Sequence, residues 1–139
     1  MTETKTGFQN RREFFRLKFA TPLRFKSYAV KNAVATLAQA DAVGTSRNVS
    51  ESGILFQTEN APPQLSSILW LNLDIRTLKI CQEIEERALV FNNGLLGRVV
   101  RVEEDAKNNG YDIGVCFLTQ GQKNSREVQK ILTEISKTG

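Results

Sequence analysis

The sequence contains no histidine, and this absence excludes several kinds of active site. Neither a Ser–His or Cys–His nucleophile pair nor a histidine-ligated metal is available, and the commonest general base of enzymes is missing. The two cysteines, Cys81 and Cys116, lie far apart in the chain, so we expect neither a disulfide framework nor a CxxC metal site. We therefore expect a binding protein without a metal or cofactor, and not an enzyme.

Long hydrophobic runs are also missing. No apolar stretch approaches the roughly 18 residues that indicate a transmembrane helix. The polar start of the chain has no basic residues followed by an apolar segment, which is the pattern of a secretory signal. We expect a cytoplasmic protein with no membrane span. The 139 residues fit one globular domain.

Positive charge is concentrated at one end of the chain. Residues 1–31 contain eight Lys or Arg and two acidic residues, whereas residues 32–139 contain eleven Lys or Arg and thirteen acidic residues. A local excess of cations is typical of a segment that meets a phosphate-bearing partner, and equally of a solvated basic tail.

Short segments with strand-like patterns predict a mainly β fold. Residues 21–28 alternate apolar and polar side chains at period two, as a half-buried strand does. Asn-Gly dipeptides at 93–94 and 109–110 favour positive φ and tight hairpins. Residues 29–43, rich in Ala and Val, fit either a continued strand or a short helix. Further strand-like segments lie at 54–56, 68–75, 97–102 and 111–117.

The end of the chain changes to helical periodicity. Ser125, or Asn124 before it, is a suitable N-cap for a helix there. Without repeated βαβ units, the whole pattern predicts an antiparallel barrel or sandwich with one helix packed on it. Four apolar residues recur at the i, i+3, i+4, i+7 spacing of one helical face: Val128, Ile131, Leu132 and Ile135.

Arginines near the N-terminus form the first motif that is suited to a nucleotide ligand. The motif is Arg12-x-x-x-Arg16, preceded by Arg11. Guanidinium groups match the geometry of phosphate oxygens and of the O6/N7 edge of guanine, and they stack on bases. By itself the spacing also fits surface ion pairs with nearby acids.

The second motif is Asn48-x-Ser50-x-x-Gly53, which precedes an apolar stretch. Asn supplies an acceptor and donors, Ser supplies a rotatable hydroxyl, and Gly permits a close backbone approach or a positive φ. The same residues also fit a turn that serves only the backbone.

The two motifs in this order resemble the PilZ family, as do Gly-x-Val-x-Arg at 97–101 and Tyr-Asp-Ile-Gly-Val-x-Phe at 111–117. The resemblance implies a receptor for the bacterial second messenger cyclic di-GMP, with no catalytic activity. It implies a small antiparallel six-stranded β-barrel, with its arginine arm, at 11–120. A flexible tail at 1–10 and a C-terminal helix packed on the barrel at 121–139 complete the expected organisation.

The resemblance also implies roles for the motif residues. Arg12 and Arg16 would grip guanine and phosphate, and Arg11 would help a second, stacked messenger molecule to bind. Asn48 and Ser50 would hydrogen-bond the other side of the ligand. Many family members have Asp in place of Asn48, and an amide accepts from guanine at only one atom, so we expect a somewhat lower affinity.

Three further positions complete the predicted site. Gly53 would leave room for the ligand. Arg98 is a candidate additional contact and Arg101 a weaker one, because an exposed strand face explains both arginines equally well.

Three functions fit these features. The first is a receptor that changes conformation on binding cyclic di-GMP and passes the signal to a protein that controls motility, polysaccharide or adhesion. The second is a degenerate adaptor that has lost the ligand and acts through protein–protein contact. The third is a basic barrel that binds single-stranded nucleic acid. That function predicts aromatic platforms among basic residues on several strands, whereas the cations here cluster in one arm, so we do not expect nucleic acid as a partner.

Overall fold

The computed structural model describes residues 17–78 and 80–138, which form mainly β structure. Two short strands, β1 (Leu17–Lys18) and β6 (Val90–Phe91), each pair with one of the main strands. The main strands are β2 (Pro22–Lys31), β3 (Val34–Val49), β4 (Gly53–Thr58), β5 (Ile68–Asn72), β7 (Gly94–Asp105) and β8 (Gly110–Phe117).

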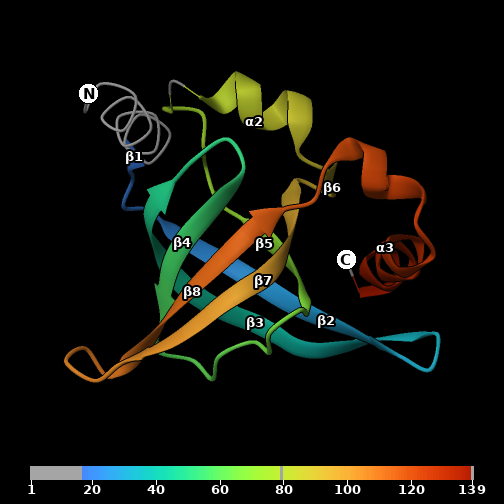
Figure 1. Ribbon diagram of the computed structural model, residues 1–139, viewed down its shortest axis with the longest axis horizontal. Helices are drawn as coiled ribbons and strands as arrows, with labels where there is room; N and C mark the ends of the chain where they lie inside the picture. Colours follow the sequence, from blue (N-terminus) through green and yellow to red (C-terminus); the bar gives the residue numbers. More distant parts are fainter. Residues whose placement is uncertain (1–16, 79, 139) are drawn as a thin grey trace, which may run out of the picture.

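These six main strands close into a ring. The order is β3–β2–β5–β7–β8–β4, and β4 pairs again with β3, with every contact antiparallel. Closure leaves no long unpaired edge around the ring, which is how a barrel avoids the exposed edges of an open sheet. Within the described residues, the six-stranded antiparallel barrel predicted from the sequence is confirmed (Figure 1).

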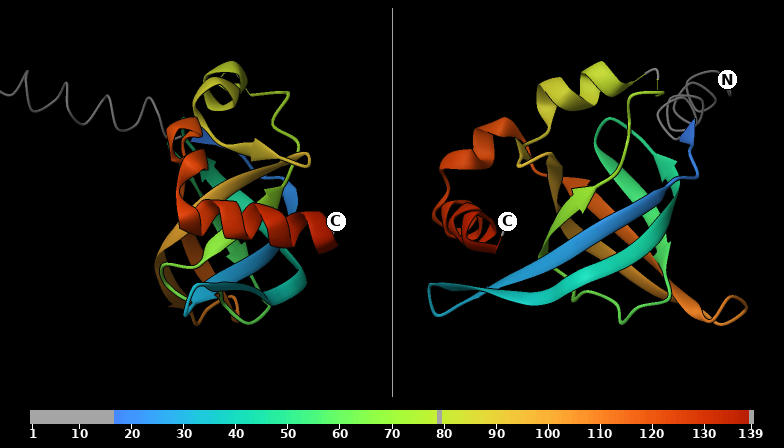
Figure 2. Two further views of the ribbon diagram at one scale, coloured as in Figure 1. Left: turned by 90° about the vertical axis from the view of Figure 1, so that its right-hand side faces the viewer. Right: turned by 180° about the vertical axis from the view of Figure 1, so that it is seen from behind.

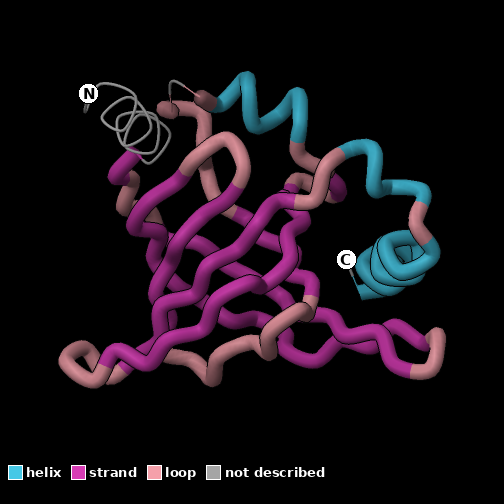
Figure 3. Tube along the Cα trace, viewed as in Figure 1, coloured by secondary structure: helices cyan, strands magenta, loops and turns pink. Residues whose placement is uncertain are grey.

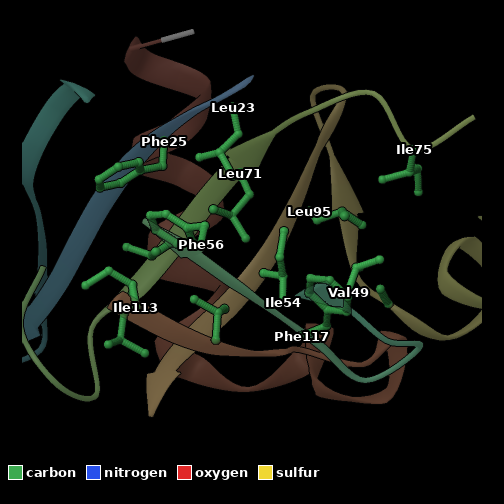
Figure 4. Packing of buried hydrophobic residues seen from close by; sticks show 14 of the residues in the cluster. Leu23, Phe25, Val49, Ile54, Phe56, Leu71, Ile75, Leu95, Ile113 and Phe117 are labelled. Carbon is green, nitrogen blue, oxygen red and sulfur yellow. The ribbon is translucent and has the colours of Figure 1, made fainter. Parts of the chain in front are cut away.

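Large apolar side chains fill the inside of the ring. Figure 4 shows that they come from several strands and point toward one another. The rings of Phe25 and Phe56 meet with their centroids 5.1 Å apart and tilted by 54°. Ile113 on β8 is fully buried in the same cluster. The alternation along β2 and β4 thus places one face of each strand in the core and leaves the other face outside.

The helix α3 (Arg126–Thr138) lies against the outside of the barrel (Figure 2). The Ser125 hydroxyl accepts a hydrogen bond from the Val128 amide (3.1 Å), as an N-cap does. The predicted apolar face of this helix is buried against Tyr28 and Ile68, which belong to β2 and β5. The outer surface of these strands is therefore covered.

A second helix, α2 (Cys81–Arg87), was not expected from the sequence. It crosses one end of the barrel, together with the short 3-10 helix η1 (Gln120–Asn124), whereas strands make up the body of the molecule (Figure 3). Only Ile84 of α2 is buried. Seven residues with one buried side chain are too few to produce a helical period in the sequence. None of the described helices has the length and hydrophobicity needed to cross a membrane.

Residues 29–31 and 34–43 belong to strands, so the helical alternative for this segment is wrong. Asn32 and Ala33 have φ of 51° and 64° and join β2 to β3 by a two-residue turn, which reverses the chain without a helix. A similar turn precedes β7, where Asn92 and Asn93 have φ of 52° and 63°. The positive φ therefore falls one residue earlier than the Asn-Gly dipeptide at 93–94 suggested, and Gly94 itself has no positive φ.

Candidate functional site: a groove across four strands

The turn between β3 and β4 is built by the serine of the second motif. The backbone amide of Ser50 donates to the Gly53 carbonyl (2.8 Å). The Ser50 hydroxyl accepts from the amides of Gly53 (3.2 Å) and Ser52 (3.3 Å). Ser50 therefore fixes the shape of the turn, and the backbone role that the motif suggested is present in the structure.

Gly53 is required by the close approach of a neighbouring strand. It pairs with Cys116 of β8, and a Cβ added to it would lie 2.3 Å from the carbonyl oxygen of Val115. Its φ is not positive, so the space taken by the β8 backbone is the reason for glycine at this position. That Gly53 also leaves room for a ligand stays a prediction.

Asn48 lies on β3 beside a bulge. Ser46 pairs with Phe56 and Asn48 pairs with Leu55, so Arg47 is an extra residue on β3. Such a bulge increases the local twist and redirects side chains. Asn48 is half-buried, and its side-chain amide has no hydrogen-bond partner among the described residues.

The Asn48–Gly53 motif forms one side of a groove of about 260 Å³. Residues of β3, β4, β7 and β8 and of the turn between β3 and β4 line it, and none of them belongs to the cluster that packs against α3. Cys116 and Val100, both exposed, lie on the β7–β8 side of this groove. The groove thus joins residues that are more than sixty positions apart in the chain (48 and 116).

The short strand β1 brings the N-terminal segment to this groove. Leu17 pairs with Val49 and Lys18 pairs with Asn48. The amide of Phe19 donates to the Arg47 carbonyl (2.9 Å). The chain that carries the arginine motif therefore joins the described residues directly beside Asn48. Three predicted site residues lie outside the described residues: Arg11, Arg12 and Arg16.

Arg98 is held away from the groove. Its guanidinium donates to Glu127 of α3 (2.5 Å) and to the carbonyl of Ser66 (2.8 Å), and it does not line the groove. Arg101 of the same strand does line it. Between them the register shifts, because Val99 pairs with Val115 but Arg101 pairs with Gly114.

This shift is a second bulge, with Val100 as its extra residue, and it turns Arg101 to the same outer face as Arg98, although the two arginines are three positions apart. Their contacts differ because Arg98 lies within reach of Glu127 of α3 and of the Ser66 carbonyl. Sequence reasoning could not find the outward position of Arg101, because a bulge is a property of strand pairing. The available signal was the glycine at position 114, opposite Arg101.

A model of the PilZ domain family matches residues 10–134, a span that includes both motifs, the barrel and most of α3. The chain belongs to the PilZ family. PilZ domains are receptors for cyclic di-GMP and are not enzymes in general. No curated protein and no solved structure gives a significant match to this chain.

The other hollows of this PilZ domain contain no described residue of either motif. A larger hollow of about 620 Å³ lies beside Val43, Gln57 and Asn108, and its lining contains neither motif residues nor a cation. Among residues 17–78 and 80–138, no group of three or more acidic or cysteine side chains is placed to hold a metal ion. We therefore assign the candidate site to the smaller groove.

Proposed function

We propose that this PilZ domain binds cyclic di-GMP in the groove beside the Ser50–Gly53 turn, changes conformation on binding, and relays the signal to a partner protein. The observation that carries the proposal is the pairing of β1 with β3. The chain that follows the arginine motif joins the barrel beside Asn48, which supports a site in which two motifs about thirty residues apart in the sequence would serve one groove.

The chemistry of the groove suits the messenger. Cyclic di-GMP carries two phosphate charges and two guanines. Arg12 and Arg16 would supply guanidinium donors for phosphate and for the O6/N7 edge of guanine. The side-chain amide of Asn48, which has no hydrogen-bond partner among the described residues, would supply a donor and an acceptor from the barrel side. Ser50 would contribute through its hydroxyl while it keeps the turn in shape.

The proposed conformational change follows from where these groups lie in the chain. The arginines and Asn48 belong to segments joined at β1, so a ligand held by both would fix the N-terminal segment against the barrel. A partner protein would then recognise the changed surface. Within this family role, the controlled process would be motility, polysaccharide production or adhesion.

A calorimetric titration tests the proposal. We expect cyclic di-GMP to bind, and GMP, cyclic AMP and single-stranded DNA to bind much more weakly. Binding should weaken as salt concentration rises, because cations at the site replace counterions around the phosphates. A folded protein that gives no heat with sub-millimolar cyclic di-GMP would contradict the receptor function and would favour the adaptor.

A further inference from the structure

A row of paired residues crosses the floor of the groove. Asn48 of β3 pairs with Leu55 of β4, Leu55 pairs with Gly114 of β8, and Gly114 pairs with Arg101 of β7. Directly paired residues share one face of a sheet. Asn48 and Arg101 therefore face the same groove from opposite sides, roughly 14 Å apart at the backbone for three strand spacings.

Gly114 gives Arg101 its position. A Cβ added to Gly114 would lie 3.0 Å from the Cβ of Arg101 and 3.7 Å from its Cδ, so the aliphatic part of the arginine runs alongside the glycine. The bulge at Val100 brings Arg101, and not its neighbour, opposite Gly114. Gly114 has no side chain to cover its neighbour, so the guanidinium of Arg101 stays at the groove.

The guanidinium of Arg101 is already paired with a carboxylate. Its Nε donates to Glu103 (2.5 Å), and the two side chains are 51% and 53% exposed. This hydrogen bond raises the pKa of Arg101, with a smaller contribution from Asp112, and lowers the pKa of Glu103. Exposed ion pairs contribute little net stability, so an incoming anion replaces the Glu103 carboxylate at small cost.

The other arginines near the groove are engaged differently. Arg98 is tied to Glu127 and to the Ser66 carbonyl. Arg47 pairs with Asp112 at 3.5 Å and does not line the groove. Among the described residues, Arg101 is the one arginine in the groove lining.

We propose that Arg101 is a further ligand contact, which binds a phosphate or the O6/N7 edge of a guanine of the messenger, and that Glu103 holds it in position until the ligand displaces the carboxylate. This inference rests on the proposed function. It adds a cation on the β7 side of the groove, across from Asn48 and β1, where the described residues begin. Glu103 acts on the ligand only through Arg101 and is a positioning residue.

Calorimetric titration of cyclic di-GMP into the full chain tests the inference. We expect Arg101→Ala to weaken binding by roughly ten- to a hundredfold, as the loss of a charge-assisted hydrogen bond predicts. The salt dependence of the affinity should also become shallower, because one cation at the phosphates has been removed. Glu103→Gln should tighten binding, because the internal competitor for Arg101 has lost its charge.

Arg101→Lys separates the two ligand chemistries. A lysine keeps a point charge for phosphate but lacks the planar fork that matches guanine O6/N7. Near-parental affinity in this variant indicates a phosphate contact, and a loss as large as that in Arg101→Ala indicates the guanine edge. Both results support Arg101 as a contact.

Arg24→Ala is the matched control. Arg24 is an exposed arginine on β2, outside the groove, with no ion-pair partner among the described residues. Its removal should leave affinity nearly unchanged. If the parent binds and folded Arg101→Ala binds equally tightly, the inference is overturned and the proposed function stands. If the parent does not bind, both fail.

Discussion

Gly53 faces the carbonyl oxygen of Val115 across the β4–β8 pair, at a distance that leaves no space for a side chain. Gly53→Ala should therefore force these two strands apart. Because the obstacle is backbone, relief requires a strand movement, and we expect a loss of about 1–3 kcal/mol in the free energy of unfolding. Urea denaturation followed by circular dichroism measures it.

Gly121→Ala is the control for this substitution. In η1, an added Cβ at position 121 would meet only the Thr119 hydroxyl, at 3.9 Å. This variant should unfold at the same urea concentration as the parent. Equal stability of the Gly53 variant and the parent would show that the strands accommodate the methyl group.

Arg12→Ala and Arg16→Ala should each weaken cyclic di-GMP binding by roughly ten- to a hundredfold. Both positions precede the strands of the barrel ring in the sequence, so the thermal midpoint of the free protein should change little. Titration and thermal unfolding of the same samples measure the two effects. Unchanged affinity, or loss of the fold itself, would contradict the assigned roles.

Arg11→Ala tests whether a second messenger molecule stacks on the first. Two stacked molecules bring four phosphate charges to one site, and an additional cation reduces their repulsion. We expect the number of ligands bound per protein to fall while the first binding event survives. A parent stoichiometry of one would remove the proposed role of Arg11.

Ser50→Ala should reduce affinity less than the arginine substitutions, because a neutral hydroxyl contributes less than a charged guanidinium. It should also lower stability, since two backbone amides of the turn lose the oxygen that accepts from them. Binding and denaturation measured together separate these effects. An affinity loss as large as that of Arg16→Ala would indicate that the turn geometry dominates recognition.

Cys116 offers a direct probe of occupancy. It is an exposed free thiol that lines the groove. Cyclic di-GMP should slow its alkylation, measured by mass spectrometry. Cys81 is the internal reference, because it lies on α2 and burial together with nearby acids raises the pKa of its thiol. Equal alkylation of Cys116 with and without ligand would place the messenger elsewhere.

Much of the fold could be predicted from the sequence, because local patterns carry it. The period-two alternation at residues 21–28 marked β2, and the four-residue apolar face with Ser125 marked α3. These signals depend only on which side of an element faces the core. The turn at Asn32 gave no such signal, since it contains no glycine and lies within a stretch rich in Ala and Val.

The site was predictable only in part. Asn48 pairs with Lys18 of β1, so the second motif lies beside the start of the described chain, but the sequence did not separate Arg98 from Arg101. Arg101 faces the groove because of a bulge at Val100, which forms only when β7 pairs with β8, and Arg98 is held away by Glu127 of α3. Pairing of distant strands has no local pattern, so the arginine in the groove became visible only in three dimensions.

The closure of the ring also bears on how the protein folds. The groove forms only when Gly53 of β4 pairs with Cys116 of β8. It is therefore absent until β8, the last strand in the sequence, has paired with both β4 and β7. Folds dominated by such distant pairings form slowly. A molecule bound in the groove stabilises only the completed barrel, so the population of folded receptor would rise with messenger concentration. The messenger would then control how much receptor survives in the cell as well as what that receptor signals.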